Sequence, residues 1–229
     1  MVKGDKVSDF LKLAVDILPT LLNGLLMTLQ LWVLTLVFGG ISAVFIALAR
    51  VYGNKPIYYL ATGYVELIRG TPLLVQIFII YYGLGDIGIY LKPFLAAVLA
   101  FSINTAAYQA EYIRGAIQSI RSGQIEAAQS IGMSKLKVIR YIIMPQALRI
   151  VIPPWSNEAI VMLKFTSLAF MVTVPELMAH GRMIATRNFR YLEVFSIVAI
   201  IYLVVVLIFT KLLDILEIKS KIPGLEARR

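Results

Sequence analysis

Apolar residues in this chain gather into long runs, and short segments between the runs carry most of the charges. A helix needs roughly 20 mostly apolar residues to cross a hydrocarbon core of about 30 Å. Runs of this length lie at about 21–49, 56–82, 93–114, 150–174 and 191–210. Backbone polar groups must be paired in lipid, and no run alternates like a barrel strand. We therefore predict an all-α polytopic membrane protein with about five spans in one transmembrane domain, residues 1–229.

The basic residues give these spans a direction. Thirteen Lys and Arg fall on the face that holds the connection between the third and fourth spans, and seven fall on the opposite face. Because basic residues gather in cytoplasmic loops, we predict that the N-terminus lies outside and the C-terminus in the cytoplasm. Residues 1–16 mix Lys with Asp, and we interpret them as a short amphipathic leader into a retained first helix.

Composition supports a membrane location and excludes several chemistries. Of the 229 residues, 59% are hydrophobic and only 15% are charged, whereas soluble domains carry about a quarter. The net charge of +9 is spread between the apolar runs, so we expect no nucleic-acid partner. The chain has no cysteine and a single histidine, His180, which leaves neither a metal site nor a histidine-based triad. It has no GxxxxGK[ST] loop either, so ATP must be bound by another chain.

The longest cytoplasmic connection, about 115–149, is where coupling chemistry is expected, because long loops usually carry function. Residues 124–131 predict a two-turn helix with Glu126 in its first turn, where it complements the helix dipole. Gly132 can end this helix in left-handed geometry. The apolar residues of the helix recur at helical spacing and form one face: Ile125, Ala128 and Ile131. Such a short surface helix suits docking into a cleft of a partner.

The sequence Glu126-Ala127-Ala128, followed by Gly132 and by a segment that ends at Met144-Pro145, resembles the EAA loop of ABC importer permeases. The spacing matches throughout, with Met144 in place of the usual leucine. In that family the loop forms a coupling helix that fits a groove of the ATPase subunit. The resemblance implies that this chain couples to its ATPase through Glu126, Ala127, Ala128 and Gly132. An amphipathic surface helix without a partner is the alternative.

Three further segments resemble the polar amino acid branch of these permeases, the histidine/glutamine permease group: Glu66–Gln76, Tyr108–Glu111 and Lys164–Leu168, with Phe165 where the branch has Asp. The resemblance implies one of two permease subunits, identical or related, in a bacterial-type inner membrane. Its other partners would be an ABC ATPase that binds ATP and Mg²⁺ and an extracytoplasmic amino-acid-binding protein. This chain would bind no cofactor and would be no enzyme itself.

Ionisable residues inside spans are expensive in lipid and are candidates for substrate binding. Glu66 lies ten residues past Pro56, about 15 Å along a helix, and Glu158 lies eight residues past Ile150, about 12 Å. The two carboxylates could meet at similar depth and accept the ammonium of an amino acid, which favours basic substrates. Glu66 and Arg69 share one helix face, however, and could simply neutralise each other.

Glu158 has no basic residue three or four positions away, which makes it the stronger ligand candidate. Asn157 beside it can donate and accept hydrogen bonds. The adjacent Pro153-Pro154 predicts a break in the helix, and broken helices often line transporter sites. Small polar residues of these spans are weaker candidates: Ser156, Gln109, Thr166 and Ser167.

Two other functions are compatible with parts of the sequence. A secondary transporter or channel that works alone on small polar solutes would explain the spans and their buried charges, but not the coupling-type loop. A membrane hydrolase could use Lys164 and Ser167, which share a helix face, although such a pair is common by chance. We therefore expect a permease of an ATP-driven importer for polar, and by charge basic, amino acids.

Overall fold

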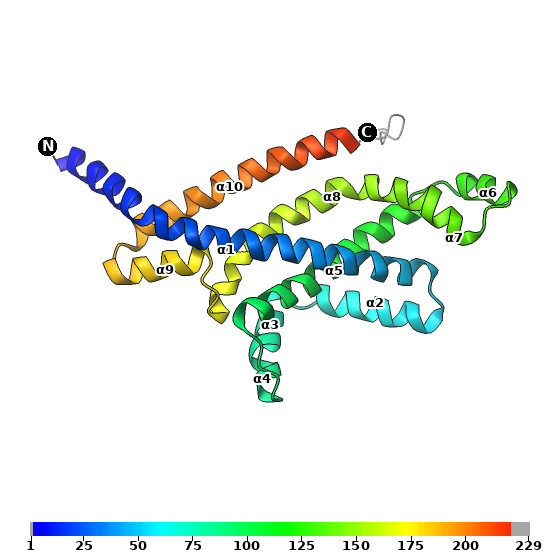
Figure 1. Ribbon diagram of the computed structural model, residues 1–229, viewed down its shortest axis with the longest axis horizontal. Coiled ribbons are helices and arrows are strands. Elements are labelled where there is room, and N and C mark those ends of the chain that lie inside the picture. The colour runs from blue at the N-terminus through cyan, green and yellow to red at the C-terminus, as the bar shows by residue number, and fades with distance from the viewer. Residues whose placement is uncertain (1, 221–229) are drawn as a thin grey trace. The chain divides into compact units, whose positions relative to one another are not determined.

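The computed structural model describes residues 2–220, and this part of the chain is almost entirely helical, with no strand (Figure 1). The elements in chain order are α1 (Val2–Tyr52), α2 (Lys55–Arg69), α3 (Leu73–Phe78), η1 (Ile79–Gly83), α4 (Leu84–Asp86), α5 (Pro93–Gln118), α6 (Ser122–Ser130), α7 (Lys135–Val138), η2 (Ile139–Ile143), α8 (Met144–Phe165), η3 (Thr166–Val172), α9 (Leu177–Asn188) and α10 (Tyr191–Ser220). The prediction of a cytoplasmic C-terminus falls on residues 221–229, which lie outside the described residues.

The chain divides into two compact units, which are described separately. The first consists of Met1–Thr35, Leu73–Phe101 and Ile160–Phe209, and the second of Leu36–Pro72, Ser102–Ala159 and Thr210–Arg229. Within the described residues, two helical stretches, Ser8–Tyr52 and Tyr191–Ser220, are long and apolar enough to span a membrane. The number rises to as many as four if each of two bent helix pairs counts as one span. The α-helical class is therefore confirmed, whereas the number of five spans stays a prediction.

The predicted second span, 56–82, is interrupted. α2 ends at Arg69, and the next helix begins only at Leu73. Pro72 explains the interruption, because proline lacks an N–H and pushes the residue before it out of helical geometry. The hydroxyl of Thr71 donates to the carbonyl oxygen of Leu67 at 2.9 Å and so satisfies one acceptor that the helix end leaves open.

The helix break predicted at Pro153-Pro154 is wrong, because α8 continues through both prolines. Membrane helices tolerate proline where neighbouring groups satisfy the freed backbone carbonyls. The regular helix ends instead at Phe165, where the 3₁₀ segment η3 begins. Thr173 then adopts a left-handed backbone, with φ of 66°, before α9 starts.

The core of the first unit joins α1, α9 and α10, and the N-terminal part of α1 lies beside α9 (Figure 1). Its buried residues are Leu13, Ile17, Leu21, Leu177, Ile184, Ala185, Val194, Ile197 and Val198. Gly181 permits the closest approach in this core, because a Cβ there would lie 2.6 Å from Cγ2 of Val198. Glu176 caps α9 by accepting bonds from the backbone N–H groups of Met178 and Ala179, both at 2.8 Å.

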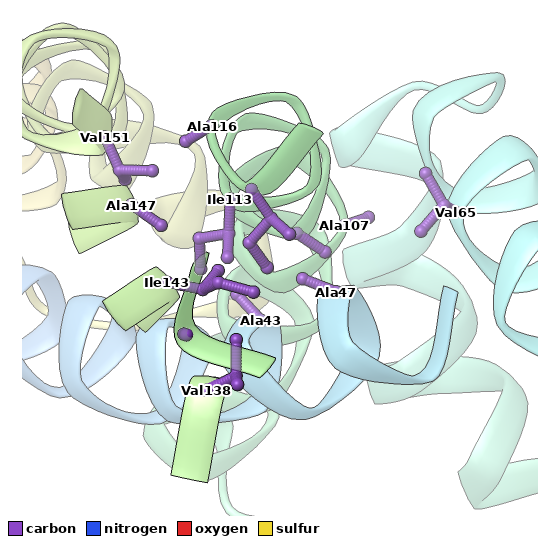
Figure 2. Packing of buried hydrophobic residues seen from close by; sticks show 13 residues of the cluster. Ala43, Ala47, Val65, Ala107, Ile113, Ala116, Val138, Ile143, Ala147 and Val151 are labelled. Atoms are coloured by element: carbon purple, nitrogen blue, oxygen red, sulfur yellow. The ribbon is translucent and has the colours of Figure 1, made fainter. Parts of the chain in front are cut away.

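The core of the second unit is built mainly from small side chains, as Figure 2 shows. Its alanines come from four helices: Ala43 and Ala47 of α1, Ala107, Ala110 and Ala116 of α5, Ala128 of α6, and Ala147 of α8. Small residues let membrane helices approach closely and gain van der Waals contact. This close packing holds α5 and α8 together and so positions the polar side chains described below.

Candidate functional site

The predicted coupling helix is present as α6, in the second unit. It begins at Ser122, two residues earlier than predicted, and ends at Ser130. Glu126 therefore lies beyond the first turn, and the prediction that it complements the helix dipole from that turn is wrong. The side chains of Glu126 and Ala127 are both exposed. They are free to meet a partner from the solvent side.

Gly132 ends α6 in the left-handed geometry that the sequence predicts, with φ of 82°. The N–H groups of Gly132 and Met133 donate to the carbonyl oxygens of Gln129 and Ala128, at 2.9 and 3.1 Å. These two bonds form a Schellman motif, which satisfies carbonyls that a helix end would otherwise leave open. Because any side chain is strained at this φ, Gly132 sets the turn between α6 and α7.

One side of α6 packs on the core of the second unit. Ala128 is 5% exposed and belongs to that core, whereas Ile131 is 79% exposed. The predicted apolar face that Ile125 and Ala128 share with Ile131 is therefore wrong at Ile131, because α6 ends one residue before it. Ile131, Leu136 (78% exposed) and Tyr141 (61%) leave apolar surface uncovered on a polar loop.

An open groove of about 490 Å³ lies beside α6, and Ala127, Ile131 and Tyr141 are among its lining residues. The start of α8 is tied to α6 across this groove, since Nε2 of Gln146 donates to Oε1 of Gln124 at 2.6 Å. This hydrogen bond is a direct contact between α6 and α8. An exposed apolar groove of this kind is typical of a docking surface.

The polar cluster around Glu158 is the second candidate site, and it also lies within the second unit. Glu158 of α8 is only 8% exposed. Tyr112 of α5 hydrogen-bonds its side chain, and Arg69 of α2 is close enough for its charge to attract the carboxylate. The acid that has no basic neighbour along its own helix thus has polar neighbours from two other helices.

Arg69 is held by an aromatic ring and not by an acid. Its guanidinium carbon lies 5.3 Å from the centroid of the Tyr108 ring, which is a cation–π arrangement. The predicted pairing of Arg69 with Glu66 is not found among the ion pairs of the described residues, and Glu66 is exposed on α2. Arg69 and Glu158 form no direct ion pair there either. Two opposite charges therefore lie near each other without contact.

The remaining candidates separate by burial. Gln109 is 1% exposed, and its Nε2 has no hydrogen-bond partner; Ser156 is 8% exposed, and its Oγ has none either. Asn157, by contrast, is exposed. Gln109 also lies close to α1, because a Cβ at Gly40 would come within 3.3 Å of its Oε1.

Sequence reasoning missed Arg69, Tyr108 and Tyr112 as members of the Glu158 cluster. Tyr108 and Tyr112 are four residues apart on α5 and so share one helix face. That spacing is visible in the sequence, but it names no partner on α8. Their role depends on the packing of α5 against α8, which local sequence does not reveal.

Glu111, the acid of the Tyr108–Glu111 segment, forms ion pairs within the protein. Glu111 of α5 pairs with both Arg50 of α1 and Arg114 of its own helix. Arg50 also donates to the hydroxyl of Thr62 on α2, at 3.3 Å. This ion cluster joins three helices of the second unit, so these charges need no ligand to explain them.

The family model of the binding-protein-dependent transport system inner membrane component matches residues 36–221. The chain therefore belongs to this family of ABC transporter permeases.

Relatives of known assignment and a solved structure agree. The glutamine transport system permease protein GlnP of Escherichia coli is 41% identical over 209 residues, which cover 90% of this chain and 94% of that protein. The histidine/lysine/arginine/ornithine transport system permease protein HisM of Escherichia coli is 40% identical, over 80% of this chain and 81% of that protein. A crystal structure of an amino acid ABC transporter with histidines has a chain that is 42% identical and matches with a TM-score of 0.85, over 92% of this chain and 98% of that one. The permease fold implied by the resemblance is thereby confirmed.

Proposed function

We propose that this chain is a transmembrane permease subunit of an ATP-driven importer for polar amino acids. The observation that carries the proposal is the match to the amino acid ABC transporter structure, at 42% identity and a TM-score of 0.85 over nearly the whole chain. The chain forms part of the translocation pathway and hydrolyses no ATP itself. ATP and Mg²⁺ bind to a separate ATPase subunit, which docks on the α6 loop.

The working assembly contains two permease subunits, identical or related, and one ATPase for each. An extracytoplasmic amino-acid-binding protein delivers the substrate. Closure of the ATPases pushes on Glu126, Ala127, Ala128 and Gly132, and the permeases change between inward-open and outward-open states. The exposed surface of α6 and its groove support this role, because they leave apolar residues such as Ile131 uncovered.

Five spans, with the N-terminus outside and the C-terminus in the cytoplasm, remain the topology that we propose. α5 is the remaining span of this topology, and its interior carries buried polar residues such as Asn104, Thr105 and Gln109. Its 26 residues are long enough, at about 39 Å, to cross the bilayer. α1, α5, α8 and α10 each have residues in both units, so we keep residues 1–229 as one permease domain.

The Glu158 cluster is our proposed substrate site within this chain. An amino acid has an ammonium and a carboxylate, and each needs a partner once its water is removed. Glu158 accepts the ammonium. Arg69 can donate two parallel bonds to the carboxylate, the geometry that guanidinium groups favour. The separation of Glu158 from Arg69 supports this assignment, because a direct ion pair would leave neither group available.

The other polar candidates complete the site in this proposal. Gln109 and Ser156 have buried polar atoms without a partner, and a substrate or water can satisfy them. Asn157 and Glu66 are exposed, and we assign them to the route by which the substrate reaches the site. Lipid covers the outer surfaces of the spans, in a bacterial-type inner membrane.

We favour basic amino acids because two acids, Glu158 and Glu66, lie within the predicted spans. Overall sequence identity does not distinguish between the candidate substrates. The glutamine permease and the histidine/lysine/arginine/ornithine permease are 41% and 40% identical to this chain. The choice therefore rests on particular side chains near the pathway.

Uptake in proteoliposomes tests the function. The chain is purified with its ATPase, and uptake of labelled amino acids is measured with and without ATP and binding protein. We expect uptake only when all three are present, with arginine, lysine or histidine as the strongest competitors. Flux that needs no ATP would overturn the proposal in favour of a secondary transporter or channel.

A further inference from the structure

α9 presents a basic face to its surroundings. Arg182, Met183, Thr186 and Arg187 are all exposed. Positions three and four apart lie on the same side of a helix, so these four residues form one surface. The opposite side of α9 is buried in the core of the first unit. We refer to these four residues, together with Phe170 of η3, as the basic face.

The basic face is hollowed. A groove of about 480 Å³ runs along it, lined by Phe170, Ala179 and the four exposed residues of α9. The guanidinium carbon of Arg182 lies 5.4 Å from the centroid of the Phe170 ring. This cation–π contact holds one arginine in place at the edge of the groove without using its hydrogen-bond donors.

The two arginines of the groove have no acidic partner in the described part of the chain. Neither Arg182 nor Arg187 takes part in any of its ion pairs. Arg190 provides the contrast, since its Nε lies 3.3 Å from Oε1 of Glu193. The groove therefore has two positive charges that are free to attract an anionic partner, next to one arginine that is already neutralised.

α9 is rigidly mounted, so the basic face has a fixed shape. Glu176 caps its first turn with two backbone hydrogen bonds, and Tyr202 of α10 donates to the same carboxylate at 3.1 Å. Gly181 brings α9 against Val198 of α10. A partner would meet a preformed surface and would lose little affinity to ordering it.

The proposed topology places this face outside the membrane. α9 packs against the part of α1 around Leu13 and Ile17, next to the N-terminus that we place outside. Arginines are disfavoured in extracytoplasmic loops and are costly in lipid, so two unpaired ones here need a purpose. Arginine, methionine and aromatic residues together are typical of the centre of protein interfaces.

We propose that the basic face of α9 is a docking surface for the extracytoplasmic binding protein, whose acidic side chains pair with Arg182 and Arg187. The inference rests on the proposed function, and the family to which the chain belongs is dependent on such a protein. The concave, partly apolar shape favours a protein over a lipid headgroup, because Phe170 and Met183 offer contacts that a phosphate does not use. Charge pairs of this kind steer association and set its salt dependence.

The test measures how much binding protein is needed for half-maximal stimulation of ATP hydrolysis. The permease is reconstituted with its ATPase in vesicles of neutral lipid and titrated with its own binding protein at low and high salt. The double variant Arg182→Ala/Arg187→Ala is expected to need about tenfold more binding protein at low salt, and to lose most of the salt dependence. Arg190→Ala, a neighbouring arginine that Glu193 already neutralises, is the matched control and is expected to behave as the wild type.

The possible outcomes distinguish failure of the proposed docking surface from failure of the proposed importer function. An unchanged titration in the double variant, with assembled complex recovered at the wild-type level, would overturn the docking surface alone. A defect that appears only in vesicles with anionic lipid would overturn it in favour of a headgroup site. Wild-type transporter that binding protein does not stimulate would overturn the importer function and the docking surface together.

Discussion

The side chain of Tyr112 on α5 hydrogen-bonds the carboxylate of Glu158 on α8. This bond gives a polar partner to an acid that is almost fully buried. A buried acid with a hydrogen-bond partner on one side and an arginine nearby is the kind of group that we expect to accept the ammonium of a substrate.

Glu158→Gln removes the charge and keeps the shape. We expect the initial rate of amino acid uptake to fall roughly tenfold or more, because a hydrogen bond to a charged group contributes about 1.5–3 kcal/mol. Assembly with the ATPase should remain, as judged by size-exclusion chromatography. Tyr112→Phe keeps the ring and loses the donor, so it should show a smaller defect in the same direction. Uptake and selectivity equal to the wild type in Glu158→Gln would refute the role of this acid.

Arg69 should determine whether the site recognises an α-carboxylate. The assay is direct binding to the purified transporter without binding protein, so that the selectivity of that protein does not enter. Arginine is compared with the same molecule lacking its carboxylate. We expect Arg69→Gln to weaken binding of the amino acid about tenfold and to leave the decarboxylated analogue unaffected. Equal losses for both ligands would show that Arg69 acts only through the structure of the site.

The sequence predicts most reliably those structural features whose cause lies within a few consecutive residues. The end of α6 was predictable, because a Schellman motif is encoded within a few consecutive residues around Gly132. Pro72 was a visible signal for the break after α2, and the length of the apolar run outweighed it. At Pro153-Pro154 the sequence predicts a break that the structure does not have, because tertiary packing can stabilise a helix that contains proline.

The Glu158 cluster shows the opposite limit. Burial of an acid within a span was predictable from its apolar neighbours, but its partners come from α2 and α5, far away in sequence. Spacing of three residues allowed Glu66 and Arg69 to pair, yet it did not require it, and Arg69 stacks on Tyr108 instead. Contacts between helices depend on packing that single-sequence patterns do not encode.

Gly132 should be needed for coupling. Gly132→Pro cannot adopt a φ of 82°, because proline fixes φ near −65°, and it also removes the N–H that bonds Gln129. We expect ATP hydrolysis to continue while uptake is lost, measured in the same proteoliposomes. Gly132→Ala should show a partial defect, because a left-handed alanine costs about 1–2 kcal/mol.

Gly123→Ala is the matched control for the coupling loop. Gly123 lies within α6, has no positive φ, and has no heavy atom within 4 Å of where a Cβ would be, so alanine should be tolerated there. A fully coupled Gly132→Pro transporter would contradict the role of the left-handed turn, and an uncoupled Gly123→Ala would show that the loop responds to any change.

Gly181 and Val198 should be energetically coupled in the core of the first unit. A Cβ at Gly181 would lie 2.6 Å from Cγ2 of Val198, and a β-branched side chain cannot easily move away. We expect Gly181→Ala to destabilise the protein by about 1–3 kcal/mol through overpacking. Val198→Ala removes the obstacle, so the double variant should be more stable than the sum of the two single effects, by about 0.5–3 kcal/mol. Denaturant unfolding of the detergent-solubilised complex measures the stability of the wild type, the two single variants and the double variant.

Gly63→Ala is the control, since no heavy atom lies within 4 Å of its Cβ position and alanine should stabilise the interior of α2 by roughly 0.5–1 kcal/mol. Strictly additive effects of Gly181→Ala and Val198→Ala would mean that these two positions are not energetically coupled between α9 and α10. The contact between Gly181 and Val198 would then not explain how α9 is held against α10.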